Sequence, residues 1–144
     1  MATFIMQMRP DLLAKANDRL KTETRRLNVA RWIKVKAGDT VKVKTSRTGK
    51  VEAVFVATAD AREDELQNVS IRDCFAEGCV CPSCGYTLRD MDEYADGNGH
   101  HLCKGLQGTT IDAFRELWES INGPRSWDRN DKVAVVTFAP GGEA

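Results

Sequence analysis

Two short pairs of metal-binding side chains constrain what residues 79–105 can fold into. Cys81 and Cys84 are separated by two residues, His100 and Cys103 are also separated by two residues, and 15 residues lie between the pairs. Apolar side chains are sparse among the Gly, Asp and Asn of this stretch, so it cannot bury enough surface to fold alone. Two-residue spacing lets both side chains of a tight turn reach one tetrahedral ion. We therefore predict one structural zinc ion bound by these four side chains.

The fourth ligand stays open at this point. Cys79 lies two residues before Cys81, and His101 follows His100, so that either Cys79 or His101 could replace His100. Cys74 is assigned instead to the apolar face of a short helix and is expected in the core. The alternative interpretation is that these residues lie in a flexible loop with reduced thiols and bind no metal.

Hydrophobic periodicity predicts an α+β chain. Alternating or continuous apolar runs indicate strands, and spacings of three and four indicate helices. We expect strands at Thr3–Met8, Thr40–Thr45, Val51–Ala59 and Lys132–Phe138, helices at Pro10–Asp18 and Thr110–Ile121, and a helix that begins after Ser70 and ends before Gly78. Residues 1–144 are expected to form one domain, with residues 79–105 as an inserted zinc-binding subdomain.

Charge is distributed unevenly along the chain. Residues 1–50 contain 13 Lys and Arg against 4 Asp and Glu, whereas residues 51–144 contain 8 against 17, although the net charge of the chain is zero. This asymmetry favours either a basic face for an anionic partner or two oppositely charged halves that fold against each other. No apolar run is long enough to cross a bilayer and no secretory leader is recognisable, so we expect no membrane partner and a cytoplasmic location.

The segment Lys21-Thr-Glu-Thr-Arg-Arg26 alternates threonine with charge, which by itself is typical of a solvated edge strand. Together with other motifs it resembles the ASCH domain, a member of the PUA-like superfamily, in a version common in phages and prophages. The motifs that carry the resemblance are Lys21-Thr-x-Thr-Arg25 after a short helix, the Gly38-Asp39 turn, Ala76-Glu-Gly78, Phe114-x-x-Leu-Trp-x-x-Ile-Asn122, Ser126-Trp127 and Lys132–Phe138. The resemblance covers most of the chain except residues 79–105.

The resemblance implies a PUA-like mixed β-barrel with flanking helices, which here would carry a small zinc-ribbon-like insertion. It also implies an RNA or modified-nucleotide ligand, held by Lys21, Thr22, Thr24, Arg25 and Arg26, in the cytoplasm of a bacterial or phage-infected cell. Binding without catalysis is the first functional hypothesis.

Some small bacterial ASCH proteins are amidohydrolases that remove the acetyl group of N4-acetylcytidine. By resemblance, their lysine, nucleophilic threonine and glutamate fall on Lys21, Thr24 and Glu77. A threonine hydroxyl becomes a competent nucleophile when a nearby base removes its proton, and a lysine can be that base once burial lowers its pKa. Amide hydrolysis is therefore the second hypothesis, and a protein-interaction module that uses the zinc insertion is the third.

Overall fold

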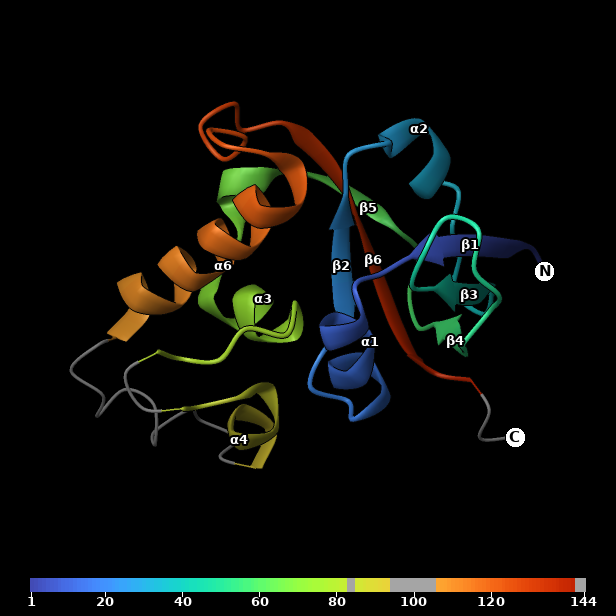
Figure 1. Cartoon of the computed structure of the whole chain (residues 1–144), viewed down its shortest axis with the longest axis horizontal. Coiled ribbons are helices and arrows are strands. Elements are labelled where there is room, and N and C mark those ends of the chain that lie inside the picture. The colour runs from blue at the N-terminus through green and yellow to red at the C-terminus, as the bar shows by residue number, and fades with distance from the viewer. Residues whose placement is uncertain (83–84, 94–105, 142–144) are drawn as a thin grey trace.

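The computed structural model describes residues 1–82, 85–93 and 106–141, without the side chains of 91–93 and 106–109. The elements in chain order are β1 (Thr3–Gln7), α1 (Pro10–Asn17), β2 (Glu23–Arg26), α2 (Val29–Trp32), β3 (Thr40–Lys44), β4 (Ala53–Ala57), β5 (Arg62–Glu65), a 3-10 turn (Leu66–Asn68), α3 (Ile71–Ala76), α4 (Leu88–Glu93), α6 (Leu106–Asn122) and β6 (Lys132–Pro140). The predicted α+β class is confirmed (Figure 1).

The long strand β6 holds the sheet together because it pairs with three other strands. Its last residues pair with β4, its middle pairs with β2, and its first residues pair with β5, in each case antiparallel. The sheet order is β1-β3-β4-β6-β2, with β1 parallel to β3. The sheet curls into a half-barrel, and among the described strands β1 and β2 do not pair to close it.

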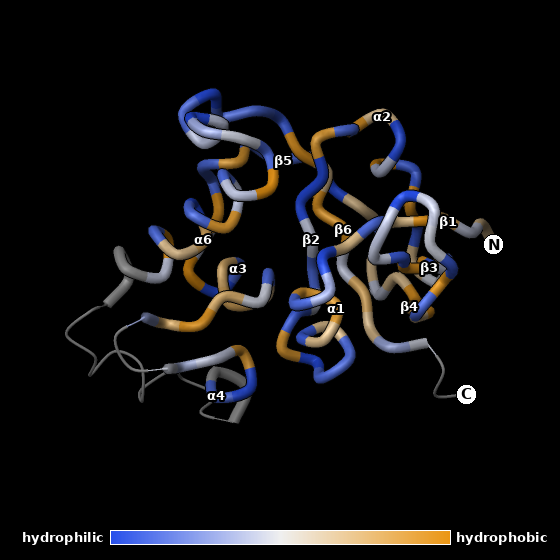
Figure 2. Tube along the Cα trace, in the orientation of Figure 1, coloured by the Kyte–Doolittle hydropathy of each residue, from blue (hydrophilic) through white to orange (hydrophobic). Residues whose placement is uncertain are grey.

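The helices lie mainly to one side of β2 and β6. In Figure 1, β1, β3, β4 and α2 lie on the right and α3, α4 and α6 on the left, while β2 and β6 run between them. Figure 2 shows that β2 is hydrophilic although it runs through the middle of the molecule. The position of β2 therefore places polar side chains between the sheet and the helices, where an apolar core would ordinarily form.

Two apolar clusters stabilise this arrangement. The sheet core packs α1 against β1, β3, β4 and the end of β6, and includes Met6, Leu12, Val43, Phe55 and Phe138. The second cluster packs α6 against the start of β6 and the residues around α3, and it contains Phe114, Trp118, Val133 and Cys74. The prediction that Cys74 is a buried core residue is confirmed, with its side chain fully shielded from solvent.

Most predicted elements are present, with shifted ends. The strand expected at Val51–Ala59 is the shorter β4, in which Val54 is 42% exposed while Phe55 is 1% exposed. Strict alternation along an antiparallel strand turns neighbouring residues to opposite faces. The short elements α2, α4 and β5 were not predicted. No helix in the described part of the chain is both long and apolar enough to span a membrane.

Candidate functional site

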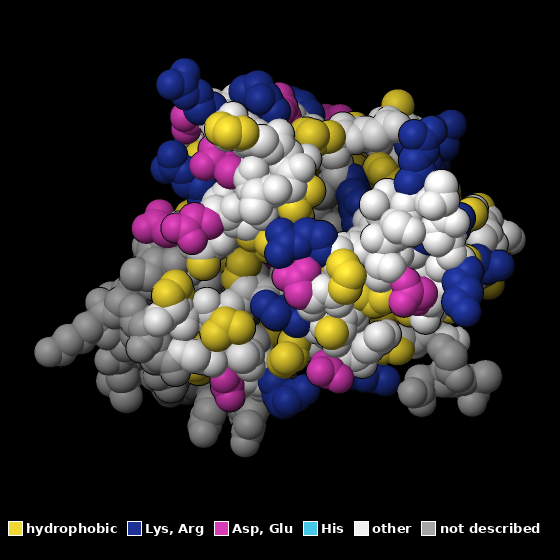
Figure 3. Space-filling model, in the orientation of Figure 1, with side chains coloured by type: hydrophobic (Ala, Val, Ile, Leu, Met, Phe, Trp, Pro, Cys, Tyr) yellow, Lys and Arg dark blue, Asp and Glu magenta, His cyan; other side chains and the backbone are white. Residues whose placement is uncertain are grey.

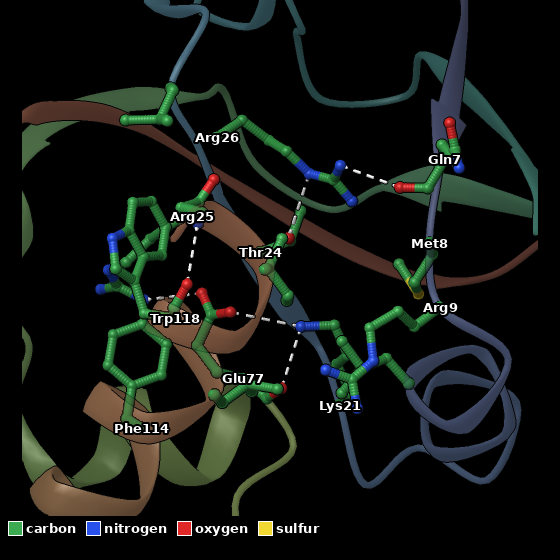
Figure 4. A pocket seen from close by; sticks show the side chains of 15 residues that line it. Gln7, Met8, Arg9, Lys21, Thr24, Arg25, Arg26, Glu77, Phe114 and Trp118 are labelled. Atoms are coloured by element: carbon green, nitrogen blue, oxygen red, sulfur yellow. Dashed lines mark hydrogen bonds and ion pairs between the residues drawn. The ribbon is translucent and has the colours of Figure 1, made fainter. Parts of the chain in front are cut away.

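A cavity of about 290 Å³ lies between β2, α6 and the connection from β1 to α1 (Figure 4). It combines a mostly apolar wall with a few convergent polar groups, as small-molecule sites commonly do. Its polar lining comes from β2 and the end of α3, and its apolar lining comes mainly from α6. The lining residues are Gln7, Met8, Arg9, Leu12, Lys21, Thr24, Arg25, Arg26, Leu27, Glu77, Phe114, Leu117, Trp118, Ile121 and Asn122.

The residues of β2 and its approach are buried despite their charge. Lys21, Glu23, Thr24 and Arg25 are all less than 9% exposed. The expectation of a solvated edge strand is therefore wrong, because β2 pairs with β6 and is also contacted by α3. Charged side chains are rarely buried unless they are paired. Each charge in this segment should then have a specific partner, and the contacts bear this out.

Lys21 lies at the centre of these contacts. Its Nζ donates to the backbone carbonyl of Glu23 at 2.9 Å, to the carbonyl of Glu77 at 2.9 Å and to Glu77 Oε1 at 3.2 Å. These three acceptors satisfy the three N–H donors of an ammonium group. Burial lowers the pKa of Lys21 below its ordinary value, and the adjacent Glu77 carboxylate offsets part of that shift. Lys21 is thus held in one position with its proton affinity reduced.

Arg25 ties three carboxylates together behind Lys21. Its Nη1 donates to Glu23 Oε1 at 2.6 Å and to Glu77 Oε2 at 3.0 Å, and its Nη2 lies 3.2 Å from Asp73 Oδ2. Burial disfavours the guanidinium charge, but Glu77 and Glu23 outweigh this effect and raise the pKa of Arg25. Glu77 is therefore held by Lys21 on one oxygen and by Arg25 on the other, which fixes the plane of its carboxylate.

The end of α3 brings Glu77 to β2. Ser70 and Asp73 form a capping box at the predicted start of α3, with the Asp73 N–H donating to Ser70 Oγ at 3.0 Å and the Ser70 N–H donating to Asp73 Oδ2 at 2.9 Å. Glu77 is the C-cap, and Gly78 follows with φ of +101°. A side chain at residue 78 would be strained at this φ and would lie 3.4 Å from Lys21 Cβ, so glycine permits the close approach of α3 to β2.

Thr24 and Arg26 face the open part of the cavity. Arg26 Nε donates to Thr24 Oγ1 at 3.2 Å and its Nη1 donates to the carbonyl of Gln7 at 2.9 Å, which Figure 4 shows as a link from β2 to β1. Burial lowers the pKa of Arg26 to about 10, which leaves it charged at neutral pH. The Thr24 hydroxyl keeps its own O–H free to donate to a neighbouring base.

The structure brings together five of the six residues that the sequence placed in a site. Lys21, Thr24, Arg25, Arg26 and Glu77 all line the cavity. Thr22 does not line it; its backbone N–H instead donates to the carbonyl of Ala76 at 2.8 Å and joins β2 to the end of α3.

Two acidic residues of the site were missed at the sequence level. Glu23 and Asp73 both pair with Arg25, and burial raises the pKa of Glu23 to about 7. Alternation along Lys21–Arg26 predicts that Glu23 and Thr24 lie on opposite faces of the strand. The alternation does not indicate that a helix packs against the face that carries Glu23. Phe114 and Trp118 pack in the second apolar cluster, and they also line the cavity.

The predicted metal ligands fall mostly outside the described residues. Cys84, His100, His101 and Cys103 are among residues without a described structure, and the zinc site stays a prediction. Cys81 and Cys79 are described, and their side chains pack into different apolar clusters, Cys81 with Phe75 and Tyr86, Cys79 with the cluster around Phe114. Within the described residues, no group of three His, Cys, Asp or Glu is placed to hold a metal ion.

The comparisons with known proteins rest on structure alone. No protein-family model and no curated protein matches the chain. The structure is similar to the ASCH domain from Lactobacillus crispatus, with a TM-score of 0.50 and 13% sequence identity over 96% of this chain and 79% of that chain. The chain has the fold of an ASCH domain. This finding supports the fold implied by the sequence resemblance, a curled half-barrel with flanking helices, and at this identity it extends to the fold alone.

Two further solved structures are also similar. One is a protein from Enterococcus faecalis, with a TM-score of 0.48 and 13% identity over 98% of this chain and 76% of that chain. The other is a protein from Pyrococcus furiosus, with a TM-score of 0.42 and 13% identity over 98% of this chain and 97% of that chain.

Proposed function

We propose that this chain is an ASCH-type protein that binds a modified nucleoside, free or within RNA, in the cavity beside β2. The observation that carries the proposal is the pairing of buried charge with aromatic surface around one cavity. Lys21, Arg25 and Arg26 supply charged groups on one wall, and Phe114 and Trp118 supply ring surface on the other. A nucleobase has polar edges and apolar faces, and such a wall matches both.

Thermal stabilisation by nucleosides tests this proposal directly. A ligand that binds only the folded state raises the midpoint of unfolding, and the stabilisation grows with the logarithm of the ligand concentration relative to Kd. We expect N4-acetylcytidine to raise the unfolding temperature of the wild type, and to do so less in Leu117→Trp, in which a larger side chain fills the cavity. Absence of any shift with N4-acetylcytidine, cytidine and the other common ribonucleosides would contradict the proposal.

A second candidate function is hydrolysis of the amide of an N4-acylated cytidine. The observation that favours it is that Lys21, Thr24 and Glu77, which come from segments more than 50 residues apart, line the same cavity. In this reaction the Thr24 hydroxyl attacks the acetyl carbonyl carbon while its proton passes to neutral Lys21 Nζ. The C–N bond then breaks, the cytidine nitrogen takes that proton, and water hydrolyses the acetyl ester of Thr24 to release acetate.

The hydrogen bonds of Lys21 determine which protonation state the hydrolysis requires. All three donors of its ammonium group are engaged by Glu77 and by backbone carbonyls, so Lys21 must lose a proton before it can accept one from Thr24. Burial favours that loss. The Glu77 carboxylate orients the Lys21 amine, and it balances the positive charge of Lys21 when Lys21 is protonated.

A comparison of the Thr24→Ala and Thr22→Ala variants distinguishes hydrolysis from binding. Both variants remove one hydroxyl from the same segment, but only Thr24 lines the cavity. We expect Thr24→Ala to lower the rate of acetate release from N4-acetylcytidine by about 10³-fold or more, as loss of a nucleophile does, and Thr22→Ala to change it less than about threefold. Equal rates in wild type and Thr24→Ala would exclude Thr24 as the nucleophile.

We also propose that residues 79–105 bind one structural zinc ion through Cys81, Cys84, Cys103 and His100. The backbone around Cys81 supports a metal-binding turn: the Cys81 N–H donates to the carbonyl of Tyr86 at 3.0 Å, the Gly85 N–H donates to the carbonyl of Cys81 at 2.9 Å, and Gly85 has φ of +75°. We expect about one equivalent of zinc in purified protein and in Cys74→Ala, and loss of the zinc in Cys84→Ser. Less than about 0.1 equivalent in wild type never exposed to chelator would contradict the site.

A further inference from the structure

A second hollow, of about 440 Å³, adjoins the cavity on the side of β1 and α2. Four of its eight lining residues are cationic, and none of the eight is acidic. The lining residues are Ile5, Gln7, Arg26, Arg31, Trp32, Lys44, Ser46 and Arg47. We call Arg26, Arg31, Lys44 and Arg47 the basic groove. Figure 3 shows Lys and Arg side chains gathered around α2 and β1 on this face of the molecule.

Arg31 and Trp32 make the groove rigid at one end. The Arg31 guanidinium lies 4.6 Å from the centre of the Trp32 ring, and its Nη2 donates to the carbonyl of Ile5 at 2.7 Å. Trp32 is buried and packs against Phe4 with 6.0 Å between ring centres. The Trp32 ring is therefore already covered, so it orients Arg31 and does not stack on a base.

The other end of the groove is formed by the strand β3 and the loop that follows it. Lys44 is the last residue of β3 and is half-buried, while Arg47 is exposed in that loop. Because no carboxylate lines the basic groove, its cations are not neutralised by acidic side chains within the groove. Its charge is available to an anion with several phosphates in a row.

Arg26 and Gln7 join the groove to the cavity because both residues line both hollows. Arg26 donates through Nη1 to the carbonyl of Gln7 and through Nε to Thr24, so its guanidinium lies at the boundary between them. A ligand whose base occupies the cavity can pass this boundary and continue along the groove. A free nucleoside would leave the groove empty.

We propose that the ligand is a nucleotide within single-stranded RNA, whose base enters the cavity while its neighbouring phosphates lie along the basic groove. This inference rests on the proposed nucleoside-binding function and names its substrate class. The strand is single because the cavity lies between β2 and α6, and a base paired in a duplex cannot reach between them. The phosphates are contacted chiefly by Arg31, Lys44 and Arg47, because Arg26 is already engaged with Thr24 and Gln7.

Fluorescence anisotropy with a labelled ten-nucleotide single-stranded RNA that contains one central N4-acetylcytidine tests the proposal. With three phosphates neutralised, affinity should fall about 20-fold between 50 and 200 mM salt. Arg47→Glu should weaken RNA binding at least about tenfold and flatten the salt dependence, and it should leave the thermal shift with free N4-acetylcytidine unchanged. Arg129→Glu is the matched control, since Arg129 is exposed in the loop between α6 and β6 and lines neither hollow.

The outcomes distinguish nucleoside binding in the cavity from RNA binding along the basic groove. If Arg47→Glu and Arg129→Glu bind the RNA equally, or if the RNA binds no more tightly than the free nucleoside, the groove proposal is wrong and nucleoside binding stands. If neither RNA nor nucleoside binds, both are wrong. If polyglutamate displaces the RNA at equal charge concentration, the groove recognises acidic polymers in general and the assignment to RNA fails.

Discussion

The sheet core and the cluster of charges beside β2 are both largely shielded from solvent, but they stabilise the fold in opposite ways. The sheet core, with Met6, Val43 and Phe55, buries apolar surface, and its contribution to stability does not depend on protonation. The ionic cluster, which we define as Lys21, Glu23, Arg25, Asp73 and Glu77, must recover the loss of hydration of five charged groups through specific contacts.

This difference identifies the charged cluster beside the cavity as the candidate functional region. A buried ionic network adds little net stability over apolar packing, and removal of one member leaves the others without compensation. The ionic cluster lies against the cavity, and three of its members, Lys21, Arg25 and Glu77, line it with charged groups. Perturbed titratable groups in a cleft are characteristic of functional sites. Three substitutions test this contrast.

The largest effect is expected for Arg25→Met. Loss of the guanidinium leaves Glu23, Asp73 and Glu77 close together without their shared cation, and we expect the free energy of unfolding to fall by about 3–5 kcal/mol at pH 8. The loss should be smaller at pH 5, where protonation relieves the repulsion. Phe55→Ala is the matched change in the sheet core, with a similar loss of about 3–5 kcal/mol that does not vary with pH. Denaturant unfolding at both pH values measures each loss, and a pH-independent loss in Arg25→Met would break the contrast.

An intermediate effect is expected for Glu23→Gln. Burial raises the pKa of Glu23 to about 7, so between about pH 4.5 and 7 the folded state binds a proton more readily than the unfolded chain. The contribution of Glu23 to the free energy of unfolding of the wild type is therefore present at low pH. It is lost as pH rises through 7, by on the order of 2–3 kcal/mol. Glu23→Gln should lack this loss. Parallel stability profiles of wild type and variant from pH 5 to 8 would show that Glu23 keeps an ordinary pKa.

The smallest effect is expected for Ser70→Ala, which removes the cap of α3 at the far end from Glu77. Loss of the hydrogen bond to the Asp73 N–H should lower the free energy of unfolding by about 1 kcal/mol and leave the sheet core untouched. Ser120→Ala, on the exposed face of α6, is a control expected to lie within about 0.5 kcal/mol of wild type. A loss above about 3 kcal/mol in Ser70→Ala would show that the cap supports the whole ionic cluster.

The sequence by itself determined the elements that local chemistry encodes. An apolar run indicated β1, alternation indicated β3, Ser70 marked the start of α3, and apolar spacing indicated α6. The resemblance carried by Lys21, Thr24 and Glu77 also selected residues that line one cavity. The helices and strands are readable because each depends on residues within a turn or two of one another.

Only the tertiary structure decided which side of β2 is covered and what lies on it. Glu23 and Asp73 are 50 residues apart, and no local pattern indicates that both contact Arg25. The same holds for the basic groove, where Arg31 from α2 meets Lys44 and Arg47 from β3 and its loop through the parallel pairing of β1 with β3. Charge along the sequence gave the excess of cations in residues 1–50, but the curl of the sheet decided that some are buried in an ionic cluster and others line an open groove.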